Sequence, residues 1–108
     1  MRKLKRSECA VLQLVLKGKW YDMIASGEKR EEYRLQTPYW AIRLSNWDNT
    51  DATAHVVEFR LGYAKDAPRV ACLSSWYTAT DKCRHPEWGE PDTLHYVIIL
   101  GERVELED

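Results

Sequence analysis

The chain has 108 residues, of which 16 are Lys or Arg and 17 are Asp or Glu, so its formal net charge is −1. Hydrophobic residues make up 44% of the chain, a share that excludes intrinsic disorder and suffices for one packed core. The near-neutral charge excludes nucleic-acid binding through the bulk attraction of an overall polycation. We therefore expect one domain over residues 1–108.

The first third of the chain predicts a strand, a helix and a second strand. The apolar run 10–16 is typical of a buried strand, and residues 18–26 have the spacing of a two-turn helix that ends at a glycine. Alternation over residues 29–35 predicts a strand with Glu32 and Arg34 on one face and apolar side chains on the other.

A second helix is predicted by Thr37 and Pro38, because a hydroxyl N-cap followed by proline is a helix-start signal. We expect this helix to be short and to extend to about Leu44. The polar segment 46–53 that follows is typical of a loop.

Strands dominate the second half. Alternation over residues 55–63 predicts a half-buried antiparallel strand, and residues 69–77 predict the next one. A long polar connection over 78–92 leads to a strong strand at 93–100. We expect the glycine after this strand to end it, before a last short strand at 103–106.

Together these elements predict a mainly β (α+β) fold. Strands of this length in so small a chain cover their edges best by curling into a barrel. The expected architecture is a mostly antiparallel β-barrel with one or two short peripheral helices.

Charge is distributed unevenly along the chain. Residues 1–50 carry a net charge of +4 and residues 51–108 carry −5, and much of this lies in a basic segment 1–8 and an acidic segment 102–108. We interpret both segments as solvated tails, and a basic binding arm is the alternative for the first.

The three cysteines, Cys9, Cys72 and Cys83, form no C-x-x-C pair, and an odd number fits no closed disulfide framework. No secretory signal is evident, and the apolar runs are too short to span a bilayer. We therefore expect a cytoplasmic protein that does not enter a membrane.

The most informative segment reads Gly-Glu-Lys-Arg-Glu-Glu-Tyr-Arg over residues 27–34. Because a helix is expected to end here and to turn directly into a strand, Lys29 should lie near the turn. Glu32 and Arg34 should project from one strand face, where they can pair or flank a ligand. An exposed strand face with ordinary surface charges is the alternative interpretation.

Gly27, Lys29, Glu32 and Arg34 match the G-x-K-x-x-E-x-R signature of the ASCH domain family, which the chain resembles over residues 10–35. The apolar strand and aromatic-bearing helix before the signature are also similar to that family. The resemblance implies a PUA-like β-barrel with a cleft between the barrel and the helix-turn-strand unit, lined by the signature side chains.

A second segment, Trp88-Gly89-Glu90-Pro91, resembles a W-G-x-P loop of small ASCH relatives. Members of the family are mostly regarded as RNA-binding modules, and some hydrolyse RNA or acetylated cytidine nucleosides. In the amidohydrolase members the signature Lys is catalytic, a Thr stands at the position of Glu32, and a downstream Glu is also needed. The chain keeps the Lys and departs from this pattern at Glu32.

Binding RNA or a nucleotide-like ligand requires cations for phosphate and flat side chains for bases. Lys29, Arg30 and Arg34 supply the cations, whereas core packing is the alternative for most aromatic residues, Trp20 above all. The aromatic candidates are Trp20, Tyr21, Tyr39, Trp40 and Trp76. The binding site that we predict from the sequence comprises Lys29, Glu32, Arg34, Arg30, Tyr21, Trp40 and Trp76.

If the chain is an enzyme, we expect a hydrolase that acts on RNA or a modified nucleoside, with Lys29 and Glu32 as its catalytic residues. Lys29 could act as a base only if burial or neighbouring cations lowered its pKa. We expect Glu32 to raise that pKa, which favours binding over catalysis. Glu58 is the candidate for a second carboxylate, and Ser74 and Ser75 are interpreted as strand hydroxyls.

Two further classes of function are considered. A protein-interaction module would use the Trp and Tyr surface and the acidic C-terminal segment. Asp81, Cys83, His85 and Glu87 alternate in one loop and could meet one metal ion, but a solvated loop is the favoured interpretation. We assign no metal and no cofactor, and the oligomeric state stays open.

Overall fold

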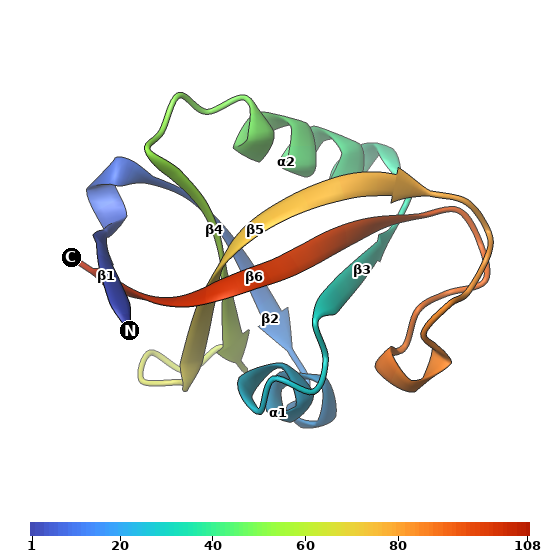
Figure 1. Ribbon diagram of the computed structural model, residues 1–108, viewed down its shortest axis with the longest axis horizontal. Coiled ribbons are helices and arrows are strands. Elements are labelled where there is room, and N and C mark those ends of the chain that lie inside the picture. The colour runs from blue at the N-terminus through green and yellow to red at the C-terminus, as the bar shows by residue number, and fades with distance from the viewer.

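The computed structural model describes residues 1–108 and contains a six-stranded sheet that curls into a half-barrel. The predicted mainly β, barrel-like fold is therefore confirmed, and neither helix is long and apolar enough to cross a membrane. The long strands β5 and β6 cross the middle of the molecule, with α1 and α2 at opposite ends of the view (Figure 1). The elements are β1 (Arg2–Lys5), β2 (Cys9–Leu16), α1 (Gly18–Ala25), β3 (Glu31–Leu35), α2 (Pro38–Asp48), β4 (Ala54–Leu61), β5 (Arg69–Ala79) and β6 (His95–Glu107), with single 3-10 turns at Arg6–Glu8 and Pro86–Trp88.

The sheet has the strand order β1-β6-β5-β4-β2, and β3 also pairs with β6. The β3–β6, β4–β5 and β5–β6 pairs are antiparallel, whereas β1–β6 and β2–β4 are parallel. In the register of these strands, Glu32 lies opposite Ile98, and Ile98 lies opposite Trp76. These three side chains therefore project from one face of the sheet.

The main core is formed by apolar side chains of the sheet and both helices. In β2 every second side chain is buried, as the pattern of a half-covered strand requires. Ile24 of α1 and Leu44 of α2 pack into this core with Phe59 of β4. Each fully buried side chain of this size contributes about 1.5–3 kcal/mol.

Helix α2 is longer than predicted. Its start is as expected, because the Thr37 hydroxyl accepts a hydrogen bond from the Trp40 amide at 3.3 Å. It continues to Asp48, however, so the prediction of a loop from residue 46 was wrong for three residues. The cause is Trp47, which is buried in the core and donates its indole N–H to the Ala10 carbonyl at 3.0 Å.

The two charged segments at the ends are not solvated tails. Residues 2–5 form β1, which pairs with the last part of β6. The Arg6 guanidinium donates two hydrogen bonds to the Glu58 carboxylate, at 2.8 and 3.2 Å, and a third to Asp108. Opposite charges at the ends of the chain therefore lie side by side, a contact between distant residues that composition does not indicate.

Strand β6 does not end at Gly101, contrary to the prediction. It continues to Glu107, but its register with β5 shifts at the glycine: Cys72 pairs with Arg103 and Ser74 with Leu100, so Gly101 and Glu102 together face Leu73. A Cβ atom at Gly101 would stand 2.9 Å from the Leu73 carbonyl oxygen. The glycine thus permits a close approach of two backbones inside a continuous strand.

Strand β4 was predicted to be half-buried and antiparallel. It is antiparallel to β5, as predicted, but it is a central strand that also pairs in parallel with β2. Because both of its faces are covered, Val56, Val57, Glu58 and Phe59 are all buried. Glu58 is therefore an interior residue paired with Arg6, and the second carboxylate predicted for the Lys29 site is not there.

Candidate functional site

Lys29 is buried in the turn between α1 and β3. Gly27, with φ of +85°, ends the helical turn, and the Lys29 amide then donates to the Met23 carbonyl at 2.9 Å. The Lys29 side chain is almost entirely buried, and its Nζ donates to the Trp88 carbonyl at 2.6 Å. A helix end and a distant loop therefore meet at one ammonium group.

The Lys29 ammonium is surrounded by an acid and two aromatic rings. Its Nζ lies 3.3 Å from Glu32 Oε1, 4.5 Å from the Tyr33 ring centroid and 5.3 Å from that of Trp20. Aromatic faces attract cations, and the attraction strengthens where water is excluded. These contacts offset part of the cost of burying the charge.

Glu32 joins Lys29 to Arg34. Its Oε2 lies 3.3 Å from Arg34 Nη1, and its Oε1 accepts the Tyr33 amide at 2.9 Å. The Arg34 guanidinium also donates to the Tyr33 carbonyl and lies over the Trp40 ring, 4.9 Å from the centroid. The expected pairing of Glu32 with Arg34 on one strand face is thus present in the structure.

Burial lowers the pKa of Lys29, and this effect outweighs the opposing attraction of Glu32. Arg34 lowers the pKa further because a second cation stands nearby. Glu32 raises the pKa, as expected, but the expected net increase was wrong because burial has the larger effect. The error arose because the depth of Lys29 depends on the loop that covers it, which the motif itself does not reveal.

A cavity of about 310 Å³ opens beside Glu32 and Arg34, a size at the lower end of small-molecule sites. Its walls come from three parts of the chain: the end of β2 and α1, strand β3, and the loop between β5 and β6. The lining residues are Leu16, Trp20, Glu32, Tyr33, Arg34, Leu35, Trp88, Gly89 and Pro91. Trp20 packs against the main core, as the favoured alternative predicted, and it also lines this cavity.

The Trp88-Gly89-Glu90-Pro91 segment forms the loop wall of the cavity. Gly89 has φ of +80°, and a Cβ atom there would come within 2.9 Å of the Trp20 ring. Only glycine therefore fits this turn without displacing the indole. The contact fixes the loop against α1 on the side where the Trp88 carbonyl meets Lys29.

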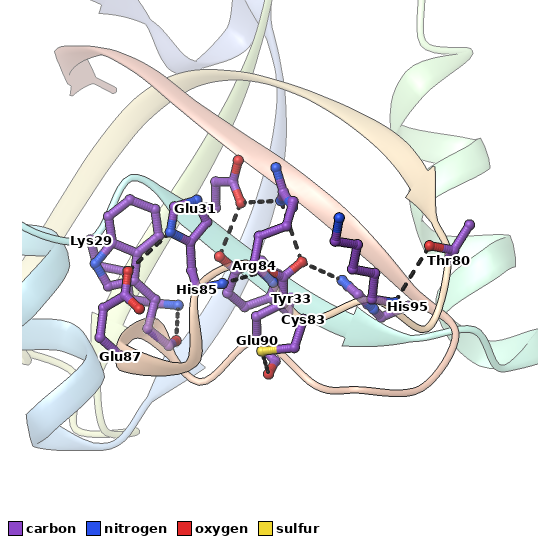
Figure 2. Close-up of polar contacts among 12 residues, drawn as sticks. Lys29, Glu31, Tyr33, Thr80, Cys83, Arg84, His85, Glu87, Glu90 and His95 are labelled. Carbon is purple, nitrogen blue, oxygen red and sulfur yellow. Dashed lines mark hydrogen bonds and ion pairs between the residues drawn. The ribbon is translucent and has the colours of Figure 1, made fainter.

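Glu90 holds the same loop from its other side (Figure 2). Its carboxylate accepts the backbone amides of Arg84 and His85 at 2.7 and 2.8 Å and lies 2.8 Å from His95 Nε2. Arg84 in turn donates to Glu31 of β3 at 2.7 Å. The loop is thus tied to β3 and β6 by a network of charged groups.

The Glu90 side chain is fully buried, and burial alone would raise its pKa. The hydrogen bonds from Arg84, His95 and His85 have the larger combined effect and lower the pKa to about 2. His95 is also fully buried, with Nδ1 2.7 Å from the Thr93 carbonyl. Both of its ring nitrogens therefore lie within hydrogen-bond distance of oxygen atoms.

Three of the four residues considered for a metal site, Cys83, His85 and Glu87, have other contacts. The Cys83 thiol donates to the Glu90 carbonyl at 3.0 Å, and the His85 ring stacks on Trp88 with centroids 4.2 Å apart. His85 Nδ1 also lies 3.0 Å from Glu87. No three His, Cys, Asp or Glu side chains lie close enough together to hold a metal ion.

Of the remaining predicted site residues, two lie beside Arg34 or on the sheet face of Glu32, and the other two lie elsewhere. Trp40 lies against Arg34, and Trp76 is half-buried on the same sheet face as Glu32, with its ring edge-on to Tyr96. Tyr21 is buried in the main core, so its predicted role as a cleft residue was wrong. Arg30 is exposed and lines a different cavity.

Sequence reasoning missed the residues that hold the loop in place. Glu90 was noted only as the variable position of the W-G-x-P segment, and no role in holding the loop was predicted for His95. Their pairing across five residues of loop and strand has no periodic signal. The one usable signal was the loop glycine beside a tryptophan, which marked the segment but not its contacts.

Comparison of the chain with known protein families, with curated proteins and with solved structures found no match to any of them.

Replacing Glu90 tests whether its ionised carboxylate holds the loop. Since folding lowers the pKa of Glu90 from 4.5 to about 2, its stabilising effect is present above pH 4.5 and is lost as the pH falls towards 2. Glu90→Gln should therefore lower the free energy of unfolding by about 2 kcal/mol at neutral pH. The difference from the wild type, measured by urea denaturation, should shrink as the pH falls through this window.

The matched control is Glu28→Gln, which removes an exposed carboxylate from the turn before β3. It should change the free energy of unfolding by less than about 0.5 kcal/mol at neutral pH. A destabilisation by Glu90→Gln that stayed constant down to acidic pH would refute the role of the ionised carboxylate.

Proposed function

We propose that the chain binds a nucleotide or a nucleotide unit of single-stranded RNA, with the nucleobase in the cavity beside Glu32 and Arg34. The observation that carries the proposal is the arrangement of Glu32 and Arg34 at one cavity that Trp20 also lines, with the Lys29 ammonium buried behind Glu32. The resemblance to the ASCH family, whose members are mostly RNA-binding modules, supports the same assignment.

The cavity offers what recognition of a base edge requires. Arg34 presents a planar set of donors, and the Glu32 carboxylate is an acceptor beside it, so both polarities of a base edge can be matched. Trp20 in the wall supplies an apolar aromatic surface, and bases stack on such surfaces without strong sequence preference. A site with both donors and acceptors is more selective than one that only attracts negative charge.

Electrostatics favours an anionic ligand only moderately. With Lys29 protonated, the Lys29–Glu32–Arg34 group carries one net positive charge, and Glu32 already neutralises part of it. Long-range attraction of RNA is therefore weak, in keeping with the near-neutral net charge. The fit of a single nucleotide unit should determine affinity more than the number of phosphates.

Replacing Arg34 tests the proposal. We expect Arg34→Gln to weaken binding of the best ligand about tenfold, since the substitution removes a charged donor at the cavity. The probes are the four ribonucleosides, their 5′-monophosphates and a short single-stranded RNA, followed by quenching of tryptophan fluorescence and by thermal shift. Binding of the RNA should weaken as salt rises.

Arg69→Gln is the matched control, because Arg69 lies at the start of β5 and lines no part of this cavity. It should leave ligand affinity within about twofold of the wild type. Failure of every probe to bind at low salt would overturn the proposal, as would an equal loss of affinity in both variants.

A hydrolase is the second candidate function, and the lowered pKa of Lys29 favours it. A lysine whose pKa is lowered has a larger neutral fraction that can accept a proton or attack a carbonyl. Glu32, 3.3 Å from Nζ, would orient this amine. Candidate substrates are RNA and N4-acetylcytidine, in keeping with the resemblance to hydrolytic ASCH members.

The hydrolase is tested by incubating the protein with N4-acetylcytidine and, separately, with an oligoribonucleotide, with products separated by chromatography. If Lys29 is the base, Lys29→Met should abolish turnover. Glu32 keeps its ion pair with Arg34 in this variant, so its carboxylate is not left without a partner. Lys19→Met serves as a control, because Lys19 also lies over the Trp20 ring but is exposed. Turnover that persists in Lys29→Met, or its absence in the wild type, would refute this function.

A further inference from the structure

A second cavity, of about 230 Å³, lies at the other end of α1 from Trp20. It is bounded by the last turn of the helix, the turn into β3 and the middle of β6. Its lining residues are Ile24, Gly27, Lys29, Arg30, Cys72, Leu100, Gly101 and Arg103. The signature residue Lys29 contributes to its wall, while the Lys29 ammonium contacts Glu32 and Trp88 of the first cavity. The two cavities are therefore neighbours across Lys29.

The charged residues that line the second cavity are Lys29, Arg30 and Arg103, and none is acidic. The largest cavity of the molecule, about 650 Å³, shares Arg103 with it but also contains Glu58, Glu105 and Asp108, whose carboxylates offset the positive charge. The smaller cavity presents cations without a carboxylate in its wall.

Arg30 has an anchored backbone and an unengaged side chain. Its carbonyl accepts the Leu100 amide at 3.0 Å, which extends the β3–β6 pairing by one residue. Its side chain is exposed and takes part in none of the hydrogen bonds or ion pairs of the structure. A cation that extends from an anchored backbone and has no acidic partner is available for an anionic ligand.

Arg103 provides a second, more rigid cation. Its Nη2 donates to the Ile24 and Ala25 carbonyls, at 2.9 and 3.0 Å, at the end of α1. A guanidinium carries five N–H groups, so the donors on Nε and Nη1 remain for other partners. The helix end fixes the orientation of this arginine beside the cavity.

Glycine backbone forms part of the wall beside these cations. Gly27 has no atom within 4 Å of the position of a Cβ, so its backbone faces open space. Gly101 lies in β6 next to Leu100, where the backbones of β5 and β6 approach closely. At Gly27 the absence of a side chain lets a ligand come close to the main chain, whereas at Gly101 the same space is filled by the Leu73 carbonyl.

We propose that the cavity lined by Arg30 and Arg103 is a phosphate subsite, which holds the phosphate of the nucleotide whose base occupies the first cavity. The inference rests on the proposed function and makes it more specific, because the ligand is then a phosphorylated nucleoside rather than a free nucleoside. Two cations and exposed glycine backbone suit a tetrahedral dianion. The mixed charges beside Glu32 suit a base edge.

The first test uses inorganic phosphate alone and follows backbone amide signals by NMR at constant ionic strength. Phosphate should shift the amides of Gly27, Arg30 and Gly101 in a saturable manner. Arg30→Gln should weaken this binding about tenfold, in line with the loss of one charged hydrogen bond. Arg2→Gln, which removes an exposed arginine of β1, should leave it unchanged.

The second test compares each ribonucleoside with its 5′-monophosphate. The monophosphate should bind about tenfold more tightly in the wild type, and Arg30→Gln should remove most of this advantage without changing the affinity for the nucleoside. A dinucleotide RNA distinguishes the two sources of phosphate. If the dinucleotide binds more tightly than the monophosphate, the subsite holds a phosphate of the RNA backbone. If the dinucleotide binds equally well or more weakly, the subsite holds the phosphate of a free nucleotide.

Equal affinity for nucleoside and monophosphate, with no saturable phosphate shifts, would overturn the subsite and leave the proposed nucleobase site intact. Saturable phosphate shifts at Gly27 and Gly101 without binding of any nucleoside would instead support the anion site and overturn the nucleobase assignment. The two proposals therefore fail through different measurements.

Discussion

The Lys29 ammonium, enclosed between the Glu32 carboxylate and the Trp88 carbonyl, is the interaction on which the site depends. It joins the turn after α1, strand β3 and a loop almost sixty residues further along the chain. Removing a charge from water costs several kcal/mol unless polar partners replace the water. Glu32, the Trp88 carbonyl and the faces of Trp20 and Tyr33 provide those partners, so the loop must be in place for the charge to be buried.

The loop is in turn held by charges of its own. Glu90 takes two backbone amides and faces His95, while Arg84 connects the same loop to Glu31 on the opposite face of β3 from Glu32. Strand β3 therefore carries acids on both faces, one contacting Lys29 and one contacting the loop. This arrangement explains how a short strand of five residues can position a cavity wall, a buried cation and a covering loop together.

Sequence reasoning succeeded where local pattern determines structure and failed where distant residues meet. Strand β2, helix α1 and the Thr37 cap follow from periodicity and capping within a few residues, and so does the placement of Glu32 and Arg34 on one face. The pairing of β1 with β6, the interior position of Glu58 and the depth of Lys29 depend on contacts across most of the chain. The motif thus identified the site from the sequence alone, whereas the burial of Lys29 and the direction of its pKa shift could be inferred only from the fold.

The central claim is that the fold buries the Lys29 charge deeply enough to lower its pKa. The most direct test is an NMR titration of the Lys29 side-chain signals, assigned by their absence in Lys29→Arg. The account predicts a midpoint below 10.5, because burial outweighs the attraction of Glu32. A midpoint at or above 10.5 would show that Glu32 dominates and would contradict the account.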